Sequence, residues 1–165
     1  MNYDKTNLIE KVTIQEIETK KSLNEIDLDF FFNYEIFPKN IMSFKTQWND
    51  KNRKIKIGDT IAQQAYIPPI KNFSQKIIFG VRINKIINEE NKKGFSYETL
   101  EGHVEKGISI FTIEEINNKI IFKIHTFSKP GNILTRLVGP IISVPYQTFC
   151  TKKALKNVNE KIKTQ

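Results

Sequence analysis

The feature that most restricts the fold of this chain is a series of short apolar segments between residues 60 and 127, separated by residues that favour turns. Within these segments apolar and polar side chains alternate, which is the pattern of a strand with one buried face. Asn117 and Asn118 lie between two such segments and are typical of a tight hairpin turn. Successive strands joined by short turns pair antiparallel. We therefore expect an antiparallel sheet from residues 60–67, 76–87, 94–100, 107–115 and 119–127.

The C-terminal part of the chain has a different period. From residue 143 onward, apolar side chains recur at three- and four-residue spacing, which predicts a long helix. Pro145 lies near its start, where proline is tolerated. Residues 133–138 are expected to form a separate helical turn, broken at Gly139-Pro140. The apolar stripe of the long helix consists of Phe149, Cys150, Ala154, Leu155, Val158 and Ile162.

A sheet with one apolar face has to cover that face, and the C-terminal helix is the obvious cover. The sequence therefore predicts an α+β fold in which a curved antiparallel sheet packs around a long C-terminal helix. Residues 7–19 form either a strand or a short helix, and residues 40–48 are expected to form a helical turn ending near Trp48. The length fits a single domain, 1–165, in which residues 1–25 are a candidate peripheral element.

Composition argues against several classes of protein. The single cysteine, Cys150, rules out an intramolecular disulfide, which suits the reducing cytoplasm. No apolar stretch approaches the ~20 residues that span a bilayer, so we expect no membrane span. The cysteine and the two histidines lack the spacing of metal ligands, and we expect no metal and no cofactor. Turns and close approach of backbones explain Gly94, Gly102 and Gly107 better than a phosphate-binding loop does.

The net charge of +8 first suggests a nucleic acid or an anionic membrane as partner. Only Arg53, Arg82 and Arg136 are arginines, however, whereas recognition of phosphate and guanine favours arginine. The many lysines are interleaved with acidic residues along most of the chain. We therefore expect no specific nucleic-acid binding. The lysines of the C-terminal helix are expected to form its solvated face, and a protein-interaction surface there is the alternative.

A curved sheet around one long helix leaves room for a cavity between them, where a small hydrophobic molecule can bind. Tyr97 and Thr99 share a strand face with Phe95, so their hydroxyls would be polar groups in an apolar wall. Arg82 joins them if it faces inward. The alternative for each is that it fills the core. The residues expected to line the cavity are Phe79, Val81, Arg82, Phe95, Tyr97, Thr99, Phe111 and Phe122.

His103 and Glu105 are two residues apart, so in an extended backbone their side chains point the same way. A carboxylate beside an imidazole raises the pKa of the imidazole, and such a pair can act as acid and base. These two are the candidate catalytic residues. The alternative is that His103 caps a loop and bonds to the backbone.

The segment from Gly94 to Gly107 also carries a family resemblance. It reads Gly-Phe-x-Tyr-x-Thr-Leu-x-Gly-His-x-Glu-x-Gly, and Phe127, Ser128 and Pro130 follow downstream. This resembles the uncharacterised bacterial and plant family known as domain of unknown function nineteen-ninety, over most of the chain from about residue 30. Many members have Glu directly after the last glycine, whereas this chain has Ile108. A polar site that uses this Glu in relatives would be altered here.

The resemblance implies a fold but no activity. The family is similar to the START-like (SRPBCC, helix-grip) superfamily, whose members bind hydrophobic small molecules or act on them beneath the long helix. Our first hypothesis is therefore a binding protein for a small hydrophobic molecule. The alternatives are an enzyme of isomerase, cyclase or hydrolase type using His103 and Glu105, and a protein-interaction module. Whether the chain is an enzyme, and whether it is a monomer or a homodimer, stays open.

Overall fold

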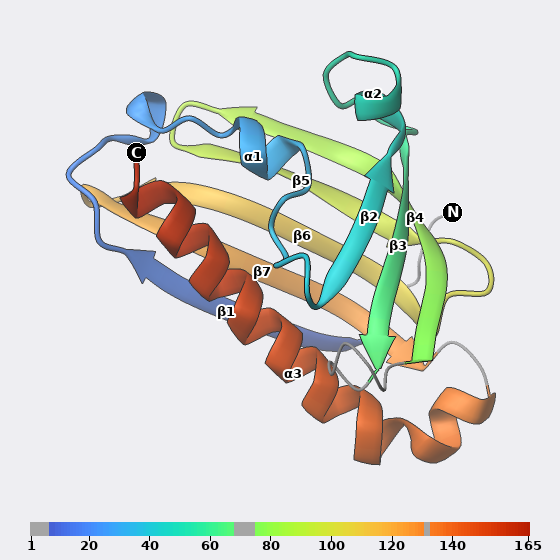
Figure 1. Ribbon diagram of the computed structural model, residues 1–165. Coiled ribbons are helices and arrows are strands. Elements are labelled where there is room, and N and C mark those ends of the chain that lie inside the picture. Colours follow the sequence, from blue (N-terminus) through green and yellow to red (C-terminus); the bar gives the residue numbers. More distant parts are fainter. Residues whose placement is uncertain (1–6, 68–74, 131–132) are drawn as a thin grey trace.

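The computed structural model describes residues 7–67, 75–130 and 133–165, with residues 133–146 described by their backbone. Seven antiparallel strands form one curved, unclosed sheet in the order β1-β7-β6-β5-β4-β3-β2, and the C-terminal helix lies across one face (Figure 1). The expected α+β class is thus confirmed. The strands are β1 (Ile9–Ile17), β2 (Met42–Thr46), β3 (Thr60–Ile67), β4 (Gln75–Glu89), β5 (Lys92–Thr99), β6 (Glu105–Ile116) and β7 (Lys119–Pro130).

The helical elements are a 3-10 turn (Leu23–Glu25), α1 (Asp29–Phe32), α2 (Gln47–Asp50) and α3 (Ile133–Lys163). None of the helices in the described ranges is both long enough and apolar enough to cross a membrane.

The expected strands all form, and each pairs with the next in an antiparallel meander. The hairpin turn is also confirmed: Asn117 and Asn118 have φ of 51° and 62°. Asparagine adopts this left-handed region more readily than most residues, and two such residues in a row match the twist of the flanking strands.

Two expectations for the N-terminal half are settled by strand pairing. The segment 7–19, left open between strand and helix, forms β1 and pairs with β7 from Ile9 to Ile17. The helical turn expected over residues 40–48 is wrong. Residues 42–46 form β2 and pair with β3, and only Gln47–Asp50 is helical. Local pattern could not reveal this because the partner strand lies more than a dozen residues away.

The break expected at Gly139-Pro140 is also wrong, because α3 runs from Ile133 to Lys163. A proline inside a helix removes one hydrogen bond and bends the axis, but flanking turns can continue the helix. The first turns of α3, orange in Figure 1, indeed run in a different direction from its red C-terminal part.

The core lies between the sheet and the two helices α1 and α3. Phe31 of α1 is fully buried, and its ring centroid lies 5.4 Å from that of Phe95 and 5.9 Å from that of Phe122. The C-terminal half of α3 buries Ala154, Val158 and other apolar residues against this layer, as its spacing predicts. The core is therefore densely aromatic at the α1 end of the sheet.

Polar side chains of α3 fix its position. The Asn157 amide donates to the backbone oxygens of Glu35 and Ile36, each at 2.9 Å. The Lys161 ammonium lies 2.8 Å from the Glu35 carboxylate. The segment after α1 is thus tied to the helix as well as to the sheet.

Candidate functional site

The candidate site lies on the inner face of the sheet, where β5 ends and β6 begins. Residues 100–104 connect the two strands, with Gly102 at φ 82° and the His103 amide donating to the Leu100 oxygen at 3.2 Å. This tight connection lets Thr99, His103 and Glu105 approach one another. The Thr99 hydroxyl accepts a hydrogen bond from the Gly107 amide at 3.0 Å, which joins the two strands at this point.

His103 is partly buried, and its ring packs on Phe79 of β4 with 4.3 Å between centroids. Its Nδ1 accepts a hydrogen bond from the Glu105 backbone amide at 3.0 Å. Nδ1 is therefore the unprotonated nitrogen, and the proton of the neutral ring is assigned to Nε2. The imidazole thus bonds to the backbone, which is the alternative that the sequence left open.

Burial lowers the pKa of His103 from 6.5 to about 4. This is opposite to the rise expected from a neighbouring carboxylate. The reason is that removal from water disfavours the charged imidazolium. His103 is accordingly neutral at pH 7.

Glu105 has its carboxylate directed toward α3. There it accepts a hydrogen bond from the Gln147 side-chain amide. Burial raises the pKa of the Glu105 carboxyl, while a hydrogen bond from Ser128 and the charge of Lys11 oppose the rise. A carboxyl of this kind exchanges its proton closer to neutral pH than a surface glutamate does.

A second set of polar side chains lies deeper on the inner face of the sheet. The Gln63 amide donates to the Tyr34 hydroxyl at 2.5 Å, and the rings of Tyr34 and Tyr97 lie 6.2 Å apart. Burial raises the pKa of both tyrosines, well above 10 for Tyr34, so both hydroxyls stay protonated. Hydrogen bonds link Tyr97 to Tyr34, Gln63 and Ser109.

The remaining residues predicted for the site lie in two places. Phe95, Phe111 and Phe122 are buried in the aromatic core, where the rings of Phe95 and Phe111 stack with 5.5 Å between centroids. Arg82 is exposed between the buried Val81 and Ile83, so it points away from the inner face. The structure thus brings His103, Glu105, Tyr97 and Thr99 to one region of the sheet and does not bring Arg82 to them.

Sequence reasoning missed Tyr34, Gln63 and Gln147. For Gln63 a signal existed, because it alternates with the buried Ile61 and Ala65 in a predicted strand. A polar residue on a buried strand face is unusual and needs a partner. Tyr34 and Gln147 come from elements distant in sequence, so no local pattern points to them.

A metal site has no support in residues 7–67, 75–130 and 133–165, where no three His, Cys, Asp or Glu side chains are grouped closely enough to hold an ion. Cys150 is buried on α3, as its position on the apolar stripe predicts.

Comparison with known proteins adds a family and a fold. The family model described as Domain of unknown function (DUF1990) matches residues 31–157. No curated protein matches the sequence. The crystal structure of hypothetical protein jhp0584 from Helicobacter pylori is similar with a TM-score of 0.60, covering 94% of this chain and 88% of that one at 10% identity. Mll3558 from Rhizobium loti gives a TM-score of 0.40 at 11% identity, over 91% of this chain and 98% of that one. At 10% identity, the first likeness shows the fold alone.

Proposed function

The chain belongs to the family described as Domain of unknown function (DUF1990), and we propose that it binds a small, largely apolar molecule beneath α3. The site is the end of the inner face that carries His103 and Glu105. The helix-grip, START-like assignment is part of this proposal. Its support is the curved sheet with α3 across one face (Figure 1).

The observation that carries the proposal is the state of the His103 ring. Its Nδ1 is occupied by the Glu105 amide, and its ring is held against Phe79. Its Nε2–H donates to no other described residue. A partly buried donor with a fixed direction and no partner among the described residues is the kind of group that orients a ligand in an apolar site.

The neighbouring groups define the chemistry of the ligand. The Phe79 ring offers an apolar surface, while His103 offers a donor and Glu105 a carboxyl of raised pKa. Such a set suits a molecule with an apolar body and a polar end that contains a hydrogen-bond acceptor. The tyrosine hydroxyls and the Gln63 amide bond to one another and form the inner end of the site.

Native mass spectrometry of the protein purified from its own host tests the proposal. The wild-type protein is expected to carry a bound small molecule. His103→Asn is the informative variant, because the Asn oxygen can still accept from the Glu105 amide while the Nε2–H is lost. We expect its affinity for the ligand to fall roughly fivefold, as for the loss of one hydrogen bond of about 1 kcal/mol, and its occupancy to fall with it.

The matched control is His125→Asn. His125 lies on the opposite face of the sheet and pairs with Glu10 at 2.7 Å, so its replacement is expected to leave occupancy unchanged. A wild-type spectrum showing only the bare chain, or equal occupancy in all three proteins, would contradict the proposal.

Acid–base catalysis by His103 and Glu105 is the second candidate; its support is that two partly buried titratable side chains with shifted pKa values lie two residues apart on the inner face, although the His103 ring contacts the backbone of Glu105 and not its carboxylate. In that case the spectra of wild-type protein would contain two related small molecules, a substrate and its product. Binding alone would give one.

A further inference from the structure

An open pocket of about 840 Å³ lies between α1, the loop after α2 and the end of β4. Neither His103 nor Glu105 contributes to its lining, so it is separate from the proposed site beneath α3. Its volume falls within the range of small-molecule sites, roughly 300–1,000 Å³.

The polar part of the lining is dominated by amides. Four of the ten lining residues are Asn33, Asn49, Asn52 and Asn88. The Asn88 oxygen accepts from the Lys93 ammonium at 2.9 Å, while the side-chain amides of the other three bond to no other described residue. An amide can donate and accept at the same time, so these three offer both kinds of contact to a ligand.

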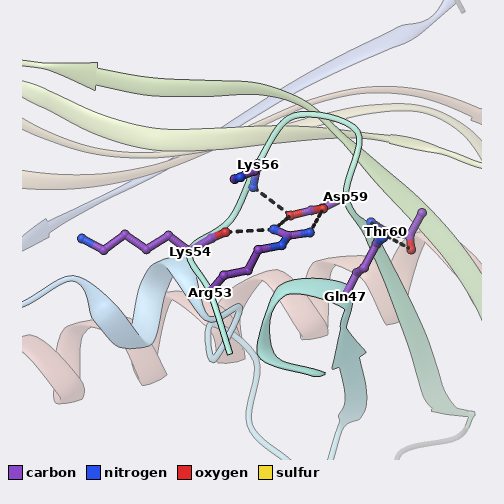
Figure 2. Close-up of polar contacts among 6 residues, drawn as sticks. All are labelled: Gln47, Arg53, Lys54, Lys56, Asp59 and Thr60. Carbon is purple, nitrogen blue, oxygen red and sulfur yellow. Dashed lines mark hydrogen bonds and ion pairs between the residues drawn. The ribbon is translucent and has the colours of Figure 1, made fainter. Parts of the chain in front are cut away.

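The charges of the pocket are largely neutralised. Figure 2 shows the Arg53 guanidinium directed at the Asp59 carboxylate, with nitrogen–oxygen distances of 2.7 and 2.6 Å, and at the Lys54 oxygen at 2.9 Å. The remaining charged lining residues, Asp29 and Lys54, have opposite signs. The pocket therefore has no net charge that would favour an anion or a cation.

The rest of the lining is apolar and anchored. Phe32, Ile55 and Ile86 are partly buried and pack on the core. Asn49 and Asn52 belong to α2 and the turn after it, which buried Trp48 holds in place; the Trp48 backbone oxygen accepts from the Arg53 amide at 3.1 Å. The amides of these two residues are thus attached to a fixed backbone beside an apolar surface.

We propose that this pocket binds a neutral saccharide. The hydroxyls of a sugar both donate and accept, which matches free asparagine amides, and its C–H faces are apolar enough to pack on Phe32 and the two isoleucines. An anionic ligand would lack a free guanidinium, because Arg53 is bound to Asp59. Phe32 is the one aromatic residue among those that line the pocket, so it provides a single stacking surface. A flat nucleobase is held best between two aromatic rings.

NMR titration of the 15N-labelled protein with maltose, cellobiose and trehalose tests this. The side-chain amide signals of asparagines report contact directly. We expect at least one disaccharide to shift the signals of Asn33, Asn49 and Asn52 in a saturable manner. Asn49→Ala removes exposed amide groups and is expected to raise the Kd of that disaccharide roughly threefold to tenfold.

The control variant is Asn40→Ala, which removes an exposed asparagine outside the pocket and is expected to leave the Kd unchanged. Adenosine monophosphate serves as the competing ligand class. Absence of saturable shifts with all three sugars would overturn the proposal, as would an unchanged Kd in Asn49→Ala or tighter binding of the nucleotide than of the sugars. The proposed site beneath α3 is unaffected by any of these outcomes.

Discussion

At the scale of single residues, the ion pair of Arg53 and Asp59 fixes the loop between α2 and β3. The Asp59 side chain is 6% exposed and the Arg53 side chain 26%. The carboxylate also accepts a hydrogen bond from the Lys56 amide at 2.8 Å. Arg53 lines the open pocket and is held by Asp59 (Figure 2), so loss of the ion pair is expected to affect both stability and the shape of that pocket.

Asp59→Asn is expected to destabilise the protein by about 2 kcal/mol at pH 7, since a charge-assisted bidentate contact becomes a weaker one. Urea unfolding, followed by the fluorescence of the single tryptophan, measures this. Asp50→Asn is the control, because Asp50 is exposed at the end of α2. Equal urea midpoints for the wild type and both variants would show that the Arg53–Asp59 pair contributes nothing to stability.

The same pair gives stability a dependence on pH. The hydrogen bond from Arg53 is the main cause of a lowered pKa at Asp59, so the folded protein binds this proton less readily than the unfolded chain. The contribution of the ion pair to stability is complete above the pKa of Asp59 in the unfolded chain, about 4. It is lost as the pH falls through the lower pKa of Asp59 in the folded protein. The difference between wild type and Asp59→Asn should therefore shrink below pH 4.

His103 shows how far residue-level reasoning from sequence extends. The two-residue spacing suggested a pair between the imidazole and the Glu105 carboxylate, but the contact that forms joins the imidazole to the Glu105 backbone amide. The spacing did not give the direction of the pKa shift, because that depends on burial against Phe79 and on which atoms of Glu105 face the ring. Both are set by the turn at residues 100–104, whose geometry no periodic pattern encodes.

At the scale of elements, the hairpins β5–β6 and β6–β7 contain two glycines at points of close backbone contact. A Cβ on Gly107 would lie 2.0 Å from the Phe127 oxygen, and one on Gly94 would lie 2.2 Å from the Phe111 oxygen. Both neighbours are backbone atoms and cannot move without separating the strands. The expectation that close approach explains these glycines is confirmed.

Gly107→Ala is accordingly expected to cost about 3 kcal/mol of unfolding free energy, near the upper end for overpacking. Gly80→Ala is the matched control: the added Cβ would lie 3.0 Å from the end of the flexible Leu100 side chain. Thermal or urea unfolding of both variants checks the difference. Comparable free energies of unfolding for the two variants would mean that β6 and β7 can move apart at Gly107 without a loss of stability.

Element prediction from the sequence succeeded where the contacts are local. The meander from β3 to β7 and its Asn117–Asn118 turn follow from alternation and turn chemistry alone. It failed for residues 42–46, which become a strand only through pairing with β3. It also failed at Gly139-Pro140, where a local breaking signal is overridden within a helix of 31 residues.

At the scale of the whole molecule, the sheet is open and ends in β1 and β2. Ile9, Val12 and Ile14 of β1 are 71%, 44% and 57% exposed. A long edge strand with exposed apolar residues is a surface that other strands can pair with. Because β1 pairs with β7, the outer edge of β7 is covered. Without β1, β7 would be the edge strand of the sheet.

Removal of residues 1–18 is therefore expected to expose β7 and to cause self-association, measured by light scattering after size exclusion. Removal of residues 1–6 alone is the control, since β1 is then retained. The experiment also tests the prediction that residues 1–25 are peripheral. A truncated chain that stays monomeric and equally stable would support a peripheral role.

The position of β1 also has a consequence for the order of synthesis. Of the strands in the described residues, β1 is translated first and its partner β7 last, with Ile9 opposite Ser128. The meander from β2 to β7 can form as it leaves the ribosome, because each strand meets a neighbour made shortly before. The nascent β1 segment must therefore wait for about 110 residues to be translated before its partner strand exists, and until then its apolar side chains have no strand to pair with.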